Sequence, residues 1–142
     1  MALTHDERLQ WLREVPLFRG CAEASLRRLT ERTTEVEFRT GTPIVQQGQV
    51  GNGLFILVVG SALVQTGDQE LARLGPGEVI GELSVIDQEP RMASVTALEP
   101  SICLALASWD LLEVLDSDPQ LARNLLAELA GRLRAADARI GE

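Results

Sequence analysis

Between Thr34 and Ala107 the chain is divided into short apolar runs by glycine and proline, and this division restricts the possible folds more than any other feature. Runs of five to seven residues have the length of a β-strand and are short for a helix. Many short strands at regular spacing are typical of an antiparallel sandwich or barrel. The runs are residues 34–38, 43–47, 54–60, 62–67, 70–75, 94–99 and 102–107.

The residues before these runs have a helical pattern. Leu9, Leu12 and Val15 are spaced along one stretch. Pro16 is expected to end it, because proline cannot continue a helix. Residues 24–30 make a second short amphipathic segment. We therefore expect two short helices in front of the strands.

The helical pattern returns after the strands. Ser108 is expected to cap a short helix that ends near Leu115. Asp118 is expected to cap a long helix from Pro119 to about Ile140, since proline is favoured at the first helical position. Apolar residues along this helix step by four and three, as in a coiled-coil heptad, so one stripe can pack on the barrel while this seam meets a partner helix. The seam is Ala122, Leu126, Leu129, Leu133, Ala136 and Ile140, and the second stripe is Leu121 and Leu125.

Composition is that of one globular domain. The chain has 142 residues, of which 45% are hydrophobic and 24% charged, and this length encloses a single core. We expect one domain over residues 1–142, with N-terminal helices in 1–33, the strands in 34–107 and C-terminal helices in 108–142.

Charge and hydropathy exclude several classes of protein. A net charge of −8 argues against a general nucleic-acid or membrane surface, so an anion must be bound at a local site. The most apolar run, Gly53–Val64, is too short to span a bilayer, and charged residues 6–8 interrupt any signal peptide. Cys21 and Cys103 are expected to be reduced thiols. These features predict a cytoplasmic protein.

The segment Gly81–Ser94, GELSVIDQEPRMAS, is the strongest candidate for an anion site. Arg91 is the only cationic residue between positions 74 and 122, in a segment rich in carboxylates. If Gly81 ends a strand and residues 82–86 form a helical turn, the N–H groups of that turn can bind an anion. Arg91 can add a planar fork that matches a phosphate. Glu82 can then accept a hydrogen bond from a sugar hydroxyl. The alternative is that Glu82 and Arg91 form a simple ion pair across a loop.

The segment 81–95 resembles the phosphate-binding cassette of the cyclic nucleotide-binding domain family: Gly-Glu-Leu-(Ala/Ser), a short helix, Pro-Arg, two variable positions and Thr or Ser. Similarity extends to residues 11–29, 38–64 and 71–82, and so covers nearly the whole chain. The resemblance implies a mainly β fold with flanking helices (α+β): an eight-stranded antiparallel jelly-roll barrel, two short N-terminal helices, a short cassette helix and a long C-terminal helix.

The resemblance also implies a role for each cassette residue. Gly81, Leu83 and Ser84 would contribute backbone groups, Glu82 would accept from the ribose, and Arg91 would bind the phosphate. The remaining contacts would come from Met92, Ala93 and Ser94 on the phosphate and base side, and from Ala136 and Asp137 nearest the purine.

The identity of residue 92 bears on which nucleotide is bound. Relatives selective for cGMP place Thr or Ser directly after the arginine, whereas this chain has Met92, which offers no hydroxyl. We therefore expect cAMP to bind more tightly than cGMP. As single large apolar side chains, Met92 and Trp109 are also expected to pack against the protein.

Three classes of function are compatible with a chain of this kind. The first is a non-catalytic cyclic nucleotide sensor that repositions its C-terminal helix, forms a homodimer through residues 119–140 and acts on an unknown effector protein. The second, a cupin-like metal enzyme, needs several His ligands, whereas His5 is the only histidine. The third is a ligand-free dimerisation module. We expect the sensor, with no metal, no cofactor beyond its ligand, no membrane contact and, since no helix-turn-helix segment follows, no direct DNA binding.

Overall fold

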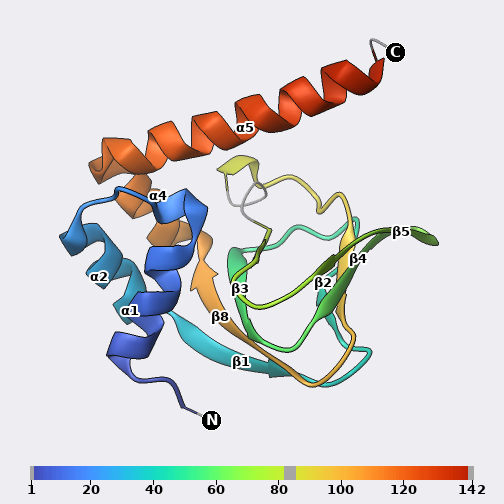
Figure 1. Cartoon of the computed structure of the whole chain (residues 1–142), viewed down its shortest axis with the longest axis horizontal. Helices are drawn as coiled ribbons and strands as arrows, with labels where there is room; N and C mark the ends of the chain where they lie inside the picture. The colour runs from blue at the N-terminus through green and yellow to red at the C-terminus, as the bar shows by residue number, and fades with distance from the viewer. Residues whose placement is uncertain (1, 82–85, 141–142) are drawn as a thin grey trace.

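The computed structural model describes residues 2–81 and 86–140, with the side chains of all but the last two. Helices lie at both ends of the sequence and strands between them (Figure 1). The elements are α1 (His5–Glu14), η1 (Pro16–Phe18), α2 (Glu23–Arg32), β1 (Thr34–Phe38), β2 (Pro43–Val45), β3 (Gly53–Val59), β4 (Ala62–Thr66), β5 (Gln69–Leu74), β6 (Val79–Ile80), β7 (Ser94–Ala97), β8 (Ser101–Ala107), α4 (Ser108–Ser117) and α5 (Pro119–Ile140).

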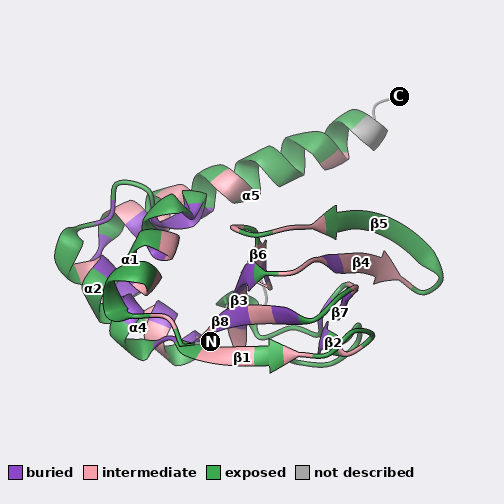
Figure 2. Ribbon diagram, turned by 60° about the horizontal axis from the view of Figure 1, so that its bottom comes forward, coloured by how far each residue is buried: buried purple, intermediate pink, exposed green. Residues whose placement is uncertain are grey.

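The strands form two four-stranded antiparallel sheets with the connectivity of a jelly roll. Their orders are β1-β8-β3-β6 and β2-β7-β4-β5. The predicted jelly roll is confirmed, although within the described residues the two sheets face each other as a sandwich and do not close into a barrel (Figure 2). Strand β6 has only two residues, which is why no apolar run marked it in the sequence.

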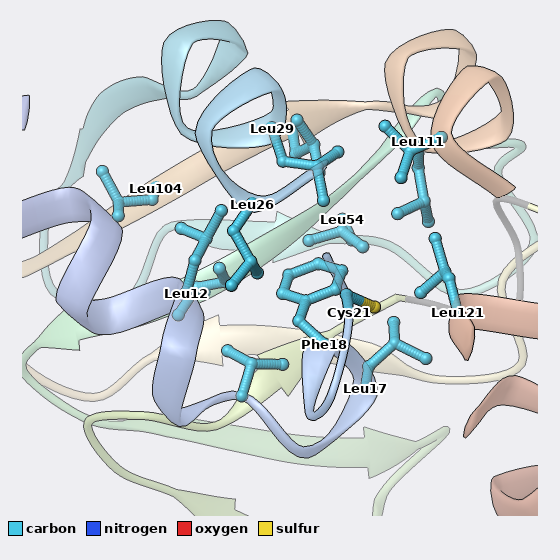
Figure 3. Close-up of a cluster of buried hydrophobic side chains, with 14 of the residues drawn as sticks. Leu12, Leu17, Phe18, Cys21, Leu26, Leu29, Leu54, Leu104, Leu111 and Leu121 are labelled. Carbon is cyan, nitrogen blue, oxygen red and sulfur yellow. The ribbon is translucent and has the colours of Figure 1, made fainter. Parts of the chain in front are cut away.

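The larger core lies between the sheet that contains β3 and the layer of helices (Figure 3). Leu54, Ile56 and Val58 alternate along β3 and face the helices, as side chains do along a strand. Phe18 lies at the centre of this cluster in Figure 3 and is 1% exposed. Each large side chain buried here contributes roughly 1.5–3 kcal/mol relative to an exposed one.

A smaller core fills the space between the two sheets. Leu57 of β3 and Cys103 of β8 contribute to it, together with Val95 of β7. Phe38 and Phe55 pack edge to face at its border, with ring centroids 6.0 Å apart. Because β3 has apolar neighbours on both faces, its sequence is an almost continuous apolar run.

The start of α5 is fixed to the N-terminal helices by polar contacts. The Asp118 carboxylate accepts hydrogen bonds from the N–H groups of Ala22 and Gln120, at 3.0 Å each, and from the Ser25 hydroxyl at 2.7 Å. The Asn124 amide donates to the carbonyls of Leu17 and Arg19. The predicted Asp118 cap is confirmed, and the same carboxylate also binds the start of α2.

Helix α5 packs differently from the prediction. Leu121 and Leu125 are buried, as expected, but against η1 and α4 rather than against the barrel. The second half of the helix extends away from this contact, and Leu126, Leu129 and Leu133 are exposed (Figures 1 and 2).

Three predictions about single residues are wrong. Ser108 does not cap α4, because β8 leads directly into the helix and Ala107 holds the cap position, without a side-chain hydrogen bond. Met92 and Trp109 do not pack in the core, since 85% and 65% of their surfaces are exposed. Their size alone was a poor guide, because Met92 lies in the bend before β7 and Trp109 in the first turn of α4, both at the surface.

Candidate functional site

The cassette begins at the end of β6 with a residue that must be glycine. Gly81 has a φ of +87°, in the left-handed region that side chains rarely adopt. Glu82, Leu83 and Ser84 lie outside the described residues, so their predicted roles stay predictions, as does the ion pair between Glu82 and Arg91. The chain is described again from Ile86 and reaches Arg91 after a turn in which Gln88 also has a positive φ, 58°.

Arg91 is buried at the centre of the site. Only 6% of its surface is exposed. Its Nη1 donates to the Gly81 carbonyl at 3.0 Å, and its Nη2 donates to the Gly53 carbonyl at 2.6 Å. These two contacts fix the position and orientation of the planar fork, whose geometry matches a phosphate.

The backbone of Arg91 is held by the loop between β2 and β3. Its N–H donates to the Gln49 carbonyl at 2.9 Å, and its carbonyl accepts from the Gly48 N–H at 2.8 Å. This two-way pairing fixes residue 91 beside a loop about 40 residues earlier in the sequence. The geometry therefore depends on two segments, of which the sequence pattern indicated only one.

Arg91 lines a cavity of about 510 Å³, within the range of small-molecule sites. The β2–β3 loop, the start of β3 and the end of β8 provide most of its wall. A larger cavity of about 920 Å³ lies between η1, the turn after β5 and α5. Two arginines line it, Arg19 and Arg132, and both are exposed, so solvent screens their charges. Arg132 also pairs with Glu128 at 2.9 Å. We favour the cavity at Arg91, because its guanidinium is buried and fixed in position, and a buried charge is screened less by solvent.

The residues after Arg91 lie beside it at the surface. The Ser94 hydroxyl accepts from the Gln47 N–H at 2.9 Å, which connects the first residue of β7 to the same β2–β3 loop. Ala93 is half-buried and Met92 is exposed. Gly81 and Ser94 thus lie in segments that are hydrogen-bonded around Arg91, but of the described residues predicted to bind the ligand only Arg91 lines the cavity of about 510 Å³.

The two residues predicted to reach the purine lie elsewhere in this structure. Ala136 is half-buried and Asp137 is exposed in the last turns of α5, and neither lines the cavity at Arg91. Figures 1 and 2 show this end of the helix away from the helical layer that holds its start.

The sequence analysis missed Gly51 of the β2–β3 loop and Gly53 at the start of β3, which both lie against the guanidinium. The sequence feature that could have indicated this contact is the glycine-rich stretch of residues 48–53, which was interpreted only as a turn. A glycine where no left-handed backbone is needed indicates close approach of another group.

The described residues offer few other reactive groups. Burial raises the pKa of the Cys103 thiol to about 12, and burial also raises the pKa of Cys21, so neither is poised as a thiolate. In residues 2–81 and 86–140 no three His, Cys, Asp or Glu side chains are arranged to hold a metal ion. Over the same residues, no helix has the length and hydropathy to cross a membrane.

Comparison with known families identifies the family of this chain. The family model for the cyclic nucleotide-binding domain matches residues 35–118, which include the strands and the whole cassette. The chain belongs to the cyclic nucleotide-binding domain family. This is a family of regulatory binding domains, and the jelly-roll topology and the position of Arg91 agree with it.

Relatives of this cyclic nucleotide-binding domain include receptors and kinases. It is 40% identical over 127 residues to the cyclic AMP receptor protein of Thermus thermophilus, covering 86% of this chain and 59% of the receptor. It is 36% identical over 124 residues to a cGMP-dependent protein kinase of Eimeria tenella, covering 86% of this chain and 12% of the kinase. The crystal structure of the Thermus thermophilus catabolite activator protein superposes with a TM-score of 0.79 at 36% identity, over 89% of this chain and 62% of that one. The chain thus spans less than two thirds of each of these proteins.

Proposed function

We propose that residues 1–142 act as one non-catalytic sensor module, which binds a cyclic nucleotide at the cassette and passes the signal to an effector protein through α5. The observation that carries the proposal is the buried guanidinium of Arg91, held by glycine carbonyls at the wall of a cavity. In a chain of net charge −8, an anionic ligand needs a cationic group at a local site, and Arg91 supplies one.

The phosphate is the group that this arrangement fits best. A cyclic phosphate diester carries one negative charge and presents oxygens to a planar fork of N–H donors. Glycine at position 81 lets the ligand approach the backbone closely. The phosphate of such a ligand carries a single negative charge, which one arginine can balance without a metal ion. A ligand with a phosphate monoester carries more charge and should fit less well.

We propose that Glu82 accepts from the ribose 2′-hydroxyl, as its place in the cassette implies. Removal of the carboxylate charge in Glu82→Gln should weaken binding less than loss of Arg91. It should also narrow the difference in affinity between cAMP and 2′-deoxy-cAMP. Calorimetry with both ligands tests this, and an unchanged difference contradicts the ribose role.

We further propose a preference for cAMP over cGMP, based on Met92. Its side chain is exposed beside Arg91, where a bound base has room to meet it, and it offers no hydroxyl to the amino group of guanine. The names of the relatives support either nucleotide, since one is a cAMP receptor and another a cGMP-dependent kinase. The preference therefore needs a direct measurement.

A thermal-shift panel with cAMP, cGMP and linear AMP, followed by calorimetry, tests the proposal. A ligand present at about 100 times its dissociation constant should stabilise the folded protein by roughly 2.7 kcal/mol. We expect the largest shift with cAMP, a smaller one with cGMP and the smallest with AMP. If none of the three shifts the transition, the chain is a ligand-free module on the same fold, and a larger shift with cGMP overturns the preference.

We propose that α5 is also the surface of a homodimer. Leu126, Leu129 and Leu133 are 65%, 38% and 63% exposed and lie three or four residues apart, so they form one apolar stripe. The start of the same helix is fixed by Asp118 and Asn124. A helix with a fixed base and an unpaired apolar end can respond both to a ligand and to a partner, which is the minimum for a switch.

Sedimentation tests the homodimer with a matched control. Leu126→Glu combined with Leu129→Glu should convert a dimer to a monomer. Val59→Glu on β3 should leave it dimeric, because Val59 is also 38% exposed but lies outside the stripe. If the parent is monomeric at high concentration with and without cAMP, the dimer is wrong.

A further inference from the structure

The guanidinium of Arg91 lies against three glycines, and two of them must be glycine for reasons of their own. Gly81 has a left-handed backbone. At Gly53 an added Cβ would lie 2.5 Å from the Leu106 carbonyl of the neighbouring strand β8, closer than real Cβ atoms come to another atom. Substitution at either position would therefore disturb the backbone, whichever side chain stood at 91.

Gly51 is different, because its backbone is not left-handed and the atoms nearest to an added side chain belong to Arg91. Its φ lies outside the left-handed region, so its backbone would accept alanine without strain. The three atoms nearest to an added Cβ all belong to the Arg91 guanidinium, with Cζ at 2.5 Å and Nη2 and Nε nearer still. The volume that a methyl group would occupy at position 51 is the volume that the guanidinium fills.

We infer that Gly51 is a positioning residue for Arg91: its lack of a side chain lets the guanidinium lie where Nη2 donates to the Gly53 carbonyl. A methyl group at 51 displaces the guanidinium, since this is the movable end of a long side chain, and leaves the fold in place. A displaced fork meets a phosphate in poorer geometry. This last step rests on the proposed function.

The position of Arg91 can be measured without any ligand. Each arginine side chain gives one Nε–Hε signal in a nitrogen–proton NMR spectrum, and the Arg91→Lys variant, which lacks one signal, assigns that of Arg91. Gly51→Ala should shift the Arg91 signal and leave the melting temperature nearly unchanged. Gly75→Ala is the matched control, because Gly75 also lacks a left-handed φ and its added Cβ would meet nothing within 4 Å. An Arg91 signal that is the same in Gly51→Ala and the parent overturns the inference.

Calorimetry with cAMP tests the consequence for binding. Gly51→Ala should weaken binding about tenfold, as expected for the loss of one hydrogen bond from a charged group. Lysine at position 91 has no planar fork to be displaced, so in the Arg91→Lys background the same change should weaken binding less than about twofold. Gly75→Ala should leave the affinity unchanged.

The outcomes separate the inference from the proposed function. Equal losses in both backgrounds would give Gly51 a general structural role and overturn the inference, as would an unchanged or higher affinity in Gly51→Ala. If the parent binds neither cAMP nor cGMP, the proposed function fails, and the ligand-free spectra alone decide whether Gly51 positions Arg91.

Discussion

Arg91 and Asp118 are both charged and both almost fully buried, with 6% and 7% of their surfaces exposed, yet they are held in opposite ways. Asp118 accepts hydrogen bonds at the starts of two helices, α2 and α5. Arg91 donates to carbonyls beside a cavity. The carboxylate is enclosed by the donors that helix N-termini leave unpaired, whereas the guanidinium lies where a ligand can reach it.

The difference predicts that Asp118 stabilises the fold and that Arg91 binds a ligand. Asp118 contacts Ala22 and Ser25, which lie 96 and 93 residues earlier in the chain. Its loss should therefore be measured as lost stability. Arg91 lies in a turn between strands, and its loss should be measured as lost affinity. The two substitutions should therefore have separate effects, Arg91→Ala on affinity and Asp118→Ala on stability.

Arg91→Ala should have the largest effect, on affinity. Truncation of one partner of a buried charged pair costs about 2–5 kcal/mol, which corresponds to a dissociation constant roughly thirty-fold to several thousand-fold higher. The control is Arg39→Ala in the exposed turn after β1, which should bind like the parent. Calorimetry measures both, and an unchanged affinity in a folded Arg91→Ala protein contradicts the phosphate role.

Asp118→Ala should have the second largest effect, on stability. It removes the cap of α5 and leaves donors at the start of α2 without their acceptor, for a combined loss of about 2–4 kcal/mol. The control is Asp68→Ala in the exposed turn between β4 and β5. Urea unfolding measures the loss, and a change below about 0.5 kcal/mol would show that water replaces the carboxylate without cost.

Lowering the pH should gradually remove the contribution of the Asp118 carboxylate to stability, and the loss should be smaller than that caused by Asp118→Ala. Hydrogen bonds from Ser25 and from the N–H of Ala22 hold the pKa of Asp118 below its usual value. A carboxyl whose pKa is lower in the folded state stabilises the fold above its unfolded pKa, about 3.9, and this contribution is lost as the pH falls through the folded pKa. The difference in unfolding free energy between the parent and Asp118→Asn should thus be constant near neutrality and shrink below about pH 4. A difference that persists unchanged to about pH 2.5 contradicts the assignment.

Local signals in the sequence were enough for the helix ends and most strands. Pro16 and the Asp118-Pro119 pair determine backbone geometry within a few residues, so their effects are readable from the sequence alone. Ser108 failed as a cap because β8 runs straight into α4, which is a property of the connection and not of serine.

The site was only half predictable, because half of it comes from a distant loop. The cassette residues are contiguous, and their order resembles that of a known family. The Gly53 carbonyl and the space at Gly51 meet Arg91 only when the β2–β3 loop folds against residue 91. Backbone carbonyls leave no mark in a sequence, and a glycine shows only that something approaches closely.

A crystal structure of the chain with cAMP tests the central claim most directly. We predict that the phosphate lies within hydrogen-bonding distance of the Arg91 guanidinium and of the backbone that follows Gly81, with Asp118 still bound to the starts of α2 and α5. A nucleotide bound instead in the larger cavity between η1 and α5, with Arg91 still on the carbonyls of Gly53 and Gly81 and no phosphate near it, would contradict the account.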